Sequence, residues 1–340
     1  MTSLVLTISE TLRYRGAIGQ WSWVLHRLSG LGVVLFITLH VIDTSWAVFY
    51  PQLYVEAIAT YQTPLFTIGE FGLVACVIYH ALNGLRIVVF DFKPVWWKHQ
   101  QKAAGWVLIG TLVILVPVFI GMFGHVLKFY NDPESKILGI GEVLSAQLPF
   151  AAGIGAAIIG AILFSGVVGI IRPEQSKAER KAGVKAKGSK LERFWWSFMR
   201  LSGLIILPLV FGHLAMMHVI QGVFDITAAN FVTVGTTAVN NTGTAVEFVA
   251  NRWNYLIGPL AIWRLYDLAL LALVTVHGFN GLRLVLTDYT GFSPLLKRGA
   301  IYLCVIGAVV LLVLGAGALF GTINDSAIKM AQEAMATLHQ

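Results

Sequence analysis

The amino-acid sequence predicts an all-α fold, a polytopic membrane bundle of seven transmembrane helices. The chain has 340 residues, of which 57% are hydrophobic and 12% are charged. Its apolar residues form long runs, and a helix needs about 20 mostly apolar residues to cross the hydrocarbon layer of a bilayer. Seven runs meet this requirement, at residues 24–49, 66–92, 104–128, 147–171, 200–224, 260–287 and 299–321.

An internal repeat is the second observation behind this fold class. The motif Arg-Leu-Ser-Gly followed by a histidine occurs twice with the same spacing, from Arg27 to His40 and from Arg200 to His213. Self-similarity at a constant spacing indicates duplicated structural units.

A second pair of motifs extends the repeat. His-x-x-Asn-Gly-Leu-Arg followed by an aspartate runs from His80 to Asp91 and again from His277 to Asp288. Two histidine pairs with matching neighbours are difficult to attribute to chance. The sequence therefore predicts two related units of three helices each.

The seventh span has a topological explanation. A unit of three spans ends on the opposite side of the membrane from its start, so an extra crossing at 147–171 is needed to make both units parallel. We expect a first repeat at 1–130, a connecting transmembrane helix with a basic cytoplasmic linker at 131–197, a second repeat at 198–325, and a tail at 326–340 that includes a short helix.

The net charge of +7 reports membrane topology and does not indicate nucleic-acid binding. Basic residues cluster at Arg13, Arg15 and Arg27, at Lys93, Lys98 and Lys102, in the linker 172–200, and at Lys297 and Arg298, whereas residues 50–63 contain no lysine or arginine. Basic loops stay on the cytoplasmic side. We expect a multi-pass protein of the cell's inner (cytoplasmic) membrane, with the N-terminus in the cytoplasm and the C-terminus outside.

The two cysteines, Cys76 and Cys304, limit the chemistry of the chain itself. An iron–sulfur cluster normally needs four cysteines. The sequence also has no glycine-rich strand-to-helix motif for a dinucleotide. Flavin or cluster chemistry would have to come from partner subunits.

Four histidines within the spans are the principal candidate ligands. Ionisable residues at membrane depth are costly and by default indicate function. Neutral imidazoles are good axial ligands of haem iron, so the matched pairs predict two b-type haems, bound by His80 with His277 and by His40 with His213. His218 competes with His213, but five residues turn an α-helix about 140° past a full circle, so both are not expected to face one ligand.

Residues beside the histidines complete the expected sites. Gly84 and Gly281 lie one turn from His80 and His277, where a missing side chain would let a flat macrocycle approach. Near the cytoplasmic boundary we expect a second cluster, which suits quinone reduction because it offers hydrogen-bond donors and a proton route. Its members are Arg27, Ser29, Asp288 and Tyr289.

These motifs resemble the anchor subunits of succinate:quinone oxidoreductase. The larger anchor is matched by His26-Arg27-x-Ser29-Gly30, His80-x-x-x-Gly84-x-Arg86 and Asp91, and the smaller by Arg200-x-Ser202-Gly203, His277-Gly278-x-x-Gly281 and Asp288-Tyr289. The matches cover six of the seven spans. The chain thus looks like a fusion of both anchors, with one connecting helix.

The resemblance implies a di-haem cytochrome b anchor with defined partners. Succinate would be oxidised at FAD in a separate flavoprotein, and electrons would cross an iron–sulfur subunit to quinone near the cytoplasmic face. His80 and His277 would ligate an inner haem near the quinone, and His40 and His213 an outer haem. Further residues expected at the cofactor sites are His26, Gly84, Gly281, Arg86 and Arg283.

One departure from the family concerns the quinone. Relatives that use ubiquinone have a serine four residues before the arginine that matches Arg27, where this chain has Trp23, with Ser22 beside it on another face. The altered pocket and the two haems favour menaquinone over ubiquinone.

Two alternatives remain open at the level of sequence. The chain could be the cytochrome b anchor of another quinone-linked dehydrogenase, such as a formate- or hydrogen-linked enzyme. It could also be a haem-free transporter with a histidine proton relay. A transporter predicts paired helix interruptions in both halves, and Pro117 and Pro208 do not occupy matching repeat positions.

Overall fold

A computed structural model describes residues 16–131, 139–171, 190–220, 234 and 240–338. Within these residues seven helices are long and apolar enough to cross a membrane, which confirms the predicted all-α polytopic bundle. These helices are α2 (Ile18–Phe49), α4 (Pro64–Phe92), α5 (Gln100–Tyr130), α6 (Ile140–Ile171), α7 (Lys190–Leu214), α9 (Ile262–Thr290) and α10 (Pro294–Phe320).

Several helices extend beyond the apolar runs that predicted them. The helix α7 begins at Lys190, ahead of the predicted 200, because its first turns contain tryptophans and charged residues that suit the membrane boundary. Its end also differs from the prediction. The chain passes into a π-helical segment, η3 (Ala215–Ile220), and the predicted 221–224 lie outside the described residues. A 3₁₀ segment, η1 (Pro94–His99), precedes α5.

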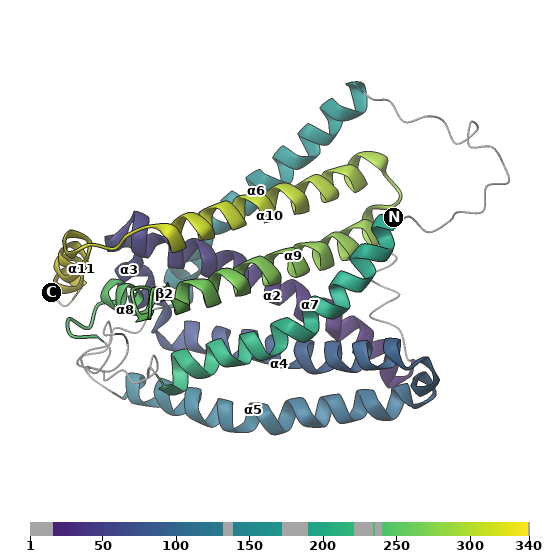
Figure 1. The fold of residues 1–340 in the computed structure, drawn as a ribbon, viewed down its shortest axis with the longest axis horizontal. Helices are drawn as coiled ribbons and strands as arrows, with labels where there is room; N and C mark the ends of the chain where they lie inside the picture. Colours follow the sequence, from purple (N-terminus) through teal and green to yellow (C-terminus); the bar gives the residue numbers. More distant parts are fainter. Residues whose placement is uncertain (1–15, 132–138, 172–189, 221–233, 235–239, 339–340) are drawn as a thin grey trace.

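The long helices lie side by side along the longest dimension of the protein (Figure 1). Helix α2 packs against α4, α9 and α10, and α7 packs against α9 and α4, so four helices (α2, α4, α7 and α9) form the centre. Helix α5 lies against α4. Helix α6 joins the bundle through α10, where the Ser165 hydroxyl donates to the carbonyl oxygen of Leu295 at 2.7 Å.

Most of the basic residues of the described spans gather at one end of the bundle, here called the basic end. Arg27 at the start of α2 contacts Asp288 at the end of α9, and Arg200 near the start of α7 contacts Asp91 at the end of α4. The segment between α4 and α5, which contains Lys93, and the start of α10, which contains Lys297, lie at the same end (Figure 1). Arg13, Arg15 and residues 172–189 of the predicted basic linker lie outside the described residues.

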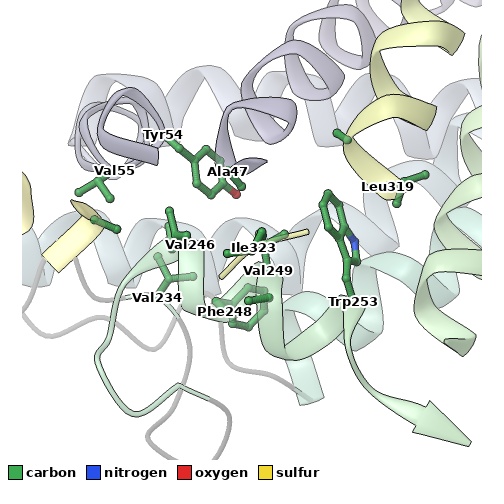
Figure 2. Close-up of a cluster of buried hydrophobic side chains, with 14 of the residues drawn as sticks. Ala47, Tyr54, Val55, Val234, Val246, Phe248, Val249, Trp253, Leu319 and Ile323 are labelled. Carbon is green, nitrogen blue, oxygen red and sulfur yellow. The ribbon is translucent and has the colours of Figure 1, made fainter. Parts of the chain in front are cut away.

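The opposite end carries a small cap that the sequence indicated only in part. Helix α11 (Asp325–Leu338) confirms the short helix predicted in the tail, whereas α3 (Pro51–Tyr61), α8 (Ala245–Trp253) and the antiparallel hairpin of β1 (Leu256–Ile257) with β2 (Leu260–Ala261) were not predicted. The largest buried hydrophobic cluster lies here (Figure 2). The hydrophobic effect does not drive helices together within lipid. It does drive apolar side chains together in a cap that contacts water.

Side chains cap the start of helix α8. The hydroxyl oxygen of Thr244 accepts a hydrogen bond from the backbone N–H of Glu247 at 3.2 Å. The Glu247 carboxylate reaches back to the N–H groups of Thr242 and Asn241, at 2.5 and 3.3 Å, and to the Thr242 hydroxyl. Burial raises the pKa of this carboxyl group, but the hydrogen bonds outweigh burial and hold the pKa below its usual value.

The cap should therefore loosen in acid. A carboxylate with a depressed folded-state pKa contributes its full stabilisation above the unfolded value of about 4.3, and this is lost as the pH falls through the folded-state pKa. Hydrogen exchange of residues 240–253, corrected for intrinsic rates, should show this loss. Glu247→Gln should remove the pH dependence and lower protection at pH 7 by about 2 kcal/mol.

The exposed Glu333 of α11 offers a matched control. Glu333→Gln should leave both the protection at pH 7 and its pH dependence unchanged. Equal behaviour of the two variants would contradict a stabilising role for Glu247.

Candidate functional site

A cavity of about 860 Å³ runs through the centre of the bundle between α2, α4, α7 and α9. Its size lies toward the upper end of the range of small-molecule and cofactor pockets. Most of its lining is apolar, and its histidines stand out against this background. The lining includes all four predicted ligands, which are His40, His80, His213 and His277.

His80, on α4, lies toward the basic end and is held by α2. Its Nδ1 atom is 3.1 Å from the carbonyl oxygen of His26 and 3.4 Å from the hydroxyl oxygen of Ser29. The His26 ring stacks on the His80 ring, with centroids 4.0 Å apart and planes 7° from parallel. A carbonyl can only accept, so Nδ1 of His80 carries the proton and Nε2 keeps its lone pair.

His277, on α9, has the equivalent support in the second half. Its Nδ1 atom lies 2.8 Å from the hydroxyl oxygen of Ser202. That hydroxyl donates its one hydrogen to the carbonyl oxygen of Phe198 at 2.6 Å, so it accepts from the N–H of His277. Nε2 of His277 is therefore also left with a lone pair.

Ser29 does not join the cluster in which the sequence places it. Arg27 lies at the basic end of the cavity, whereas Ser29 is buried against His80 and does not line the cavity. The reason is helical geometry, because residues two apart point to opposite sides of a helix. The structure gives Ser29 the position of Ser202, beside a histidine.

His40 and His213 come together toward the cap end, from α2 and α7. Their ring centroids are 6.3 Å apart, with the planes nearly perpendicular at 84°. Nδ1 of His213 lies 3.5 Å from a carboxylate oxygen of Asp267 on α9. Asp267 was not among the predicted site residues, although an acidic residue within a span, ten residues before His277, is itself an intramembrane charge that indicates function.

The expectation that His213 and His218 cannot face one ligand assumed a continuous α-helix, which the structure does not show here. Both line the cavity. The five-residue spacing would separate them on an α-helix, but the chain from Ala215 to Ile220 is π-helical, with hydrogen bonds from i to i+5. This wider turn brings residues five apart back toward the same side.

The glycines predicted to open space for a macrocycle do line the cavity. A Cβ atom on Gly84 would lie 3.6 Å from the His26 ring, and one on Gly281 would lie 3.7 Å from Met199. Two further glycines contact the histidines directly. A Cβ atom on Gly30 would lie 2.9 Å from His80, and one on Gly203 would lie 3.5 Å from His277.

Two ion pairs stand at the basic end of the cavity, each joining the two halves of the chain. Arg27 contacts Asp288, as expected, and Nε of Arg200 lies 2.7 Å from a carboxylate oxygen of Asp91. Each guanidinium also lies over the tryptophan four residues earlier, at 4.0 Å for Trp23 and 3.8 Å for Trp196. Each cluster thus contains an arginine and a tryptophan from one half of the chain and an aspartate from the other half.

The other predicted site residues divide into two groups. Arg283 lines the cavity, and its Nε atom is 3.0 Å from the side-chain oxygen of Asn280. Tyr289 and Arg86 do not line it. Tyr289 is partly buried beside Asp288, and Arg86 points toward Ser22, whose hydroxyl oxygen is 3.3 Å away.

The helices and the cavity define a multi-pass membrane protein with a histidine-lined, mostly apolar interior. The sequence model of the family "Succinate dehydrogenase/Fumarate reductase transmembrane subunit" matches residues 8–119 and 181–317, well over half of the chain. The chain therefore belongs to this family. The unmatched stretch between the two segments contains α6.

Similar curated proteins are themselves membrane anchors. The "Succinate dehydrogenase 2 membrane subunit SdhC" of Mycobacterium tuberculosis is 39% identical over 127 residues, which are 36% of this chain and 92% of the relative. The "Succinate dehydrogenase hydrophobic membrane anchor subunit" of Halobacterium salinarum is 30% identical over 106 residues, 30% of this chain and 81% of the relative. A search of solved structures found no significant match. Nearly a whole relative thus corresponds to about a third of this chain.

Repeat-related glycines allow a matched test of how tightly the histidines are held. Gly30→Ala should push a methyl group into the His80 ring, which Ser29 and His26 hold in place, and should lower stability by about 1–3 kcal/mol. Gly203→Ala should be neutral or stabilising, because its methyl group has ordinary contact distance and alanine favours the helix by about 1 kcal/mol. Thermal unfolding of the purified protein measures both. Equal melting temperatures would contradict this geometry.

Proposed function

We propose that this chain is the di-haem cytochrome b anchor of succinate dehydrogenase, passing electrons from an iron–sulfur subunit to membrane quinone near the cytoplasmic face. Family membership makes the chain a membrane anchor subunit of the succinate dehydrogenase complex. The observation that carries the finer proposal is a mostly apolar cavity that all four repeat-related histidines line together.

The residues present fit two haem groups. His80 and His277 direct Nδ1 to an oxygen acceptor, and Nδ1 of His213 faces a carboxylate, which leaves Nε2 free to bind iron. Gly30, Gly84, Gly203 and Gly281 line the same part of the cavity, and Gly30 and Gly203 let the rings of His80 and His277 pack close to the neighbouring helices. His80 and His277 would hold the inner group, and His40 and His213 the outer one. Haem b bound there supplies one-electron redox chemistry.

The quinone would bind at the basic end, beside the inner histidines. Arg27 and Asp288 meet there from opposite halves of the chain, and Tyr289 follows directly. An arginine and a phenol are donors suited to the two carbonyl oxygens of a quinone, and a carboxylate near the boundary offers a route for protons from water. The proposal assigns these three residues to binding the quinone and delivering protons to it.

Menaquinone is the proposed quinone. The position that would be serine in a ubiquinone site is Trp23, whose ring lies against the Arg27 guanidinium. The neighbouring Ser22 does not replace it, since its hydroxyl donates to the side-chain oxygen of Asn83 at 2.8 Å and is buried. An aromatic wall beside the arginine suits a larger, fused ring.

The remaining parts of the proposal concern assembly and orientation. The flavoprotein with FAD and the iron–sulfur subunit would dock at the basic end, which would face the cytoplasm, with the C-terminus on the outer side of the cell's inner membrane. The two halves would be parallel repeats joined through α6. The exchanged pairs Arg27–Asp288 and Arg200–Asp91 support this arrangement.

Of the alternatives, the anchor of a formate- or hydrogen-linked dehydrogenase is excluded by the family to which the chain belongs. The haem-free proton-coupled transporter is tested by the haem content of the purified complex.

A pyridine haemochrome assay should find two haem b groups per copy of this chain. Replacing His80 or His277 by alanine should remove one haem, and replacing His40 or His213 should remove the other, because each group would lose one of the two histidines that would hold it. An optical spectrum of each variant identifies the haem that remains. Absence of haem from an intact wild-type complex would overturn the proposal.

The quinone site has a separate test. Tyr289→Phe should slow quinone reduction at least tenfold, since general acid–base groups contribute about 10²–10⁴-fold. Succinate oxidation with an artificial electron acceptor should be unchanged, because that assay does not use the quinone. Tyr302→Phe, a phenol on α10 away from this cluster, is the control and should leave both rates intact. Equal losses in both assays for Tyr289→Phe would locate the quinone site elsewhere.

A further inference from the structure

We propose that Asp267 is the positioning residue of His213, held in place by helix α8 of the cap, and that this carboxylate sets the orientation and redox potential of the outer haem site. The inference rests on the proposed function, since it concerns a ligand of the second haem. Asp267 lies on α9 and is not part of the repeat motifs.

The geometry places one carboxylate between a histidine and two buried donors. One oxygen of Asp267 lies 3.5 Å from Nδ1 of His213 and 2.9 Å from Nη2 of Arg252. The other oxygen accepts from the indole N–H of Trp253 at 3.1 Å and lies 3.3 Å from Nε of Arg252. All four residues line the cavity.

The donors come from the last turn of α8, and the fold holds that turn firmly. Arg252 and Trp253 are each 4% exposed, and the Arg252 guanidinium lies over the Trp263 ring at 4.6 Å. Arg264 donates to the carbonyl oxygen of Trp253 at 2.9 Å. A buried cation such as the Arg252 guanidinium needs a buried counter-charge. Arg252 therefore holds Asp267 from the cap side, whether or not a ligand occupies the cavity.

Helix α7 is fixed at the same level. The hydroxyl of Tyr266, next to Asp267, donates to the carbonyl oxygen of Leu209 at 2.5 Å. Leu209 lies one turn before His213, so this bond holds the turn that carries the histidine. Tyr266 and Asp267 of α9 therefore contact α7 at Leu209 and His213, which are one helical turn apart. The packing of α9 against α7 thus fixes the distance from Asp267 to His213.

The first half of the chain has no equivalent of this contact among the residues that line the cavity. The position that matches Asp267 in the repeat is Glu70, ten residues before His80, and Glu70 does not line the cavity. The two ligands of the outer site are thus unequal, because a carboxylate faces His213 while the ring of His40 stacks near Phe36.

Carboxylate–histidine–metal arrangements have a known physical effect. An acceptor at Nδ1 selects the tautomer with Nε2 free, fixes the ring about its axis, and makes the imidazole more electron-donating. A more donating ligand stabilises ferric over ferrous iron, so removal of the negative charge should raise the reduction potential. Removal of the oxygen atoms as well should let the ring turn.

The test uses the purified whole complex with Asp267→Asn and Asp267→Ala. A redox titration monitored by optical spectra measures the reduction potential of each haem. In Asp267→Asn the potential of the outer haem should rise by about 59 mV, which is a tenfold change in its ratio of oxidised to reduced form for one electron. The potential of the inner haem should be unchanged. In Asp267→Ala the electron paramagnetic resonance signal of the ferric outer haem should also move, because that signal depends on the orientation of the ligand rings. The asparagine variant keeps the shape of the site if the alanine variant fails to fold.

Glu70→Gln is the matched control, since Glu70 occupies the equivalent repeat position in the first half and does not line the cavity. Its two potentials should equal those of the wild type. A wild-type complex with two haems whose outer potential and resonance signal do not respond to either Asp267 variant would overturn the positioning role and leave the proposed function intact. Equal shifts of both haems would overturn it as well. A wild-type complex without haem would overturn the proposed function itself, together with this inference.

Discussion

Satisfaction of polar groups inside an apolar medium is the constraint on which the rest of this structure depends. Lipid offers no partners to a buried histidine, arginine or aspartate, so each such group must find one within the protein. Helices in lipid also gain little from hydrophobic association. The polar residues of α2, α4, α7 and α9 therefore turn inward, and their pairing across the two halves both creates the site and holds the four helices together.

The pairing follows one scheme at the basic end and departs from it at the cap end. Near the basic end each half supplies an arginine to an aspartate of the other half, and each inner histidine rests on a serine hydroxyl. Toward the cap His213 lies beside the carboxylate of Asp267 on α9, and Arg252 in the last turn of α8 holds that carboxylate. The two ends of the cavity thus differ in the groups that contact their histidines.

Much of the fold could be predicted because its signals are local. Span number follows from the length of apolar runs, and the repeat from spacing along the chain. The same motifs pointed to His40, His80, His213 and His277, all of which line one cavity. The prediction placed Ser29 with Arg27 because both belong to one motif, whereas helical rotation separates them and puts Ser29 beside His80. The prediction treated the chain from His213 to His218 as α-helical, whereas Ala215–Ile220 is π-helical and His218 lines the cavity.

The sequence by itself determined the class of protein, the number of its spans and the residues that can carry its chemistry, since hydropathy, charge and motif spacing are properties of the chain alone. Only the tertiary structure decided which of these residues meet. The contact between Asp267 and His213, and the hold of Arg252 on that aspartate, join segments whose separation in the chain says nothing of their distance in space. They meet because buried charges in a medium of low polarity are stable only when paired.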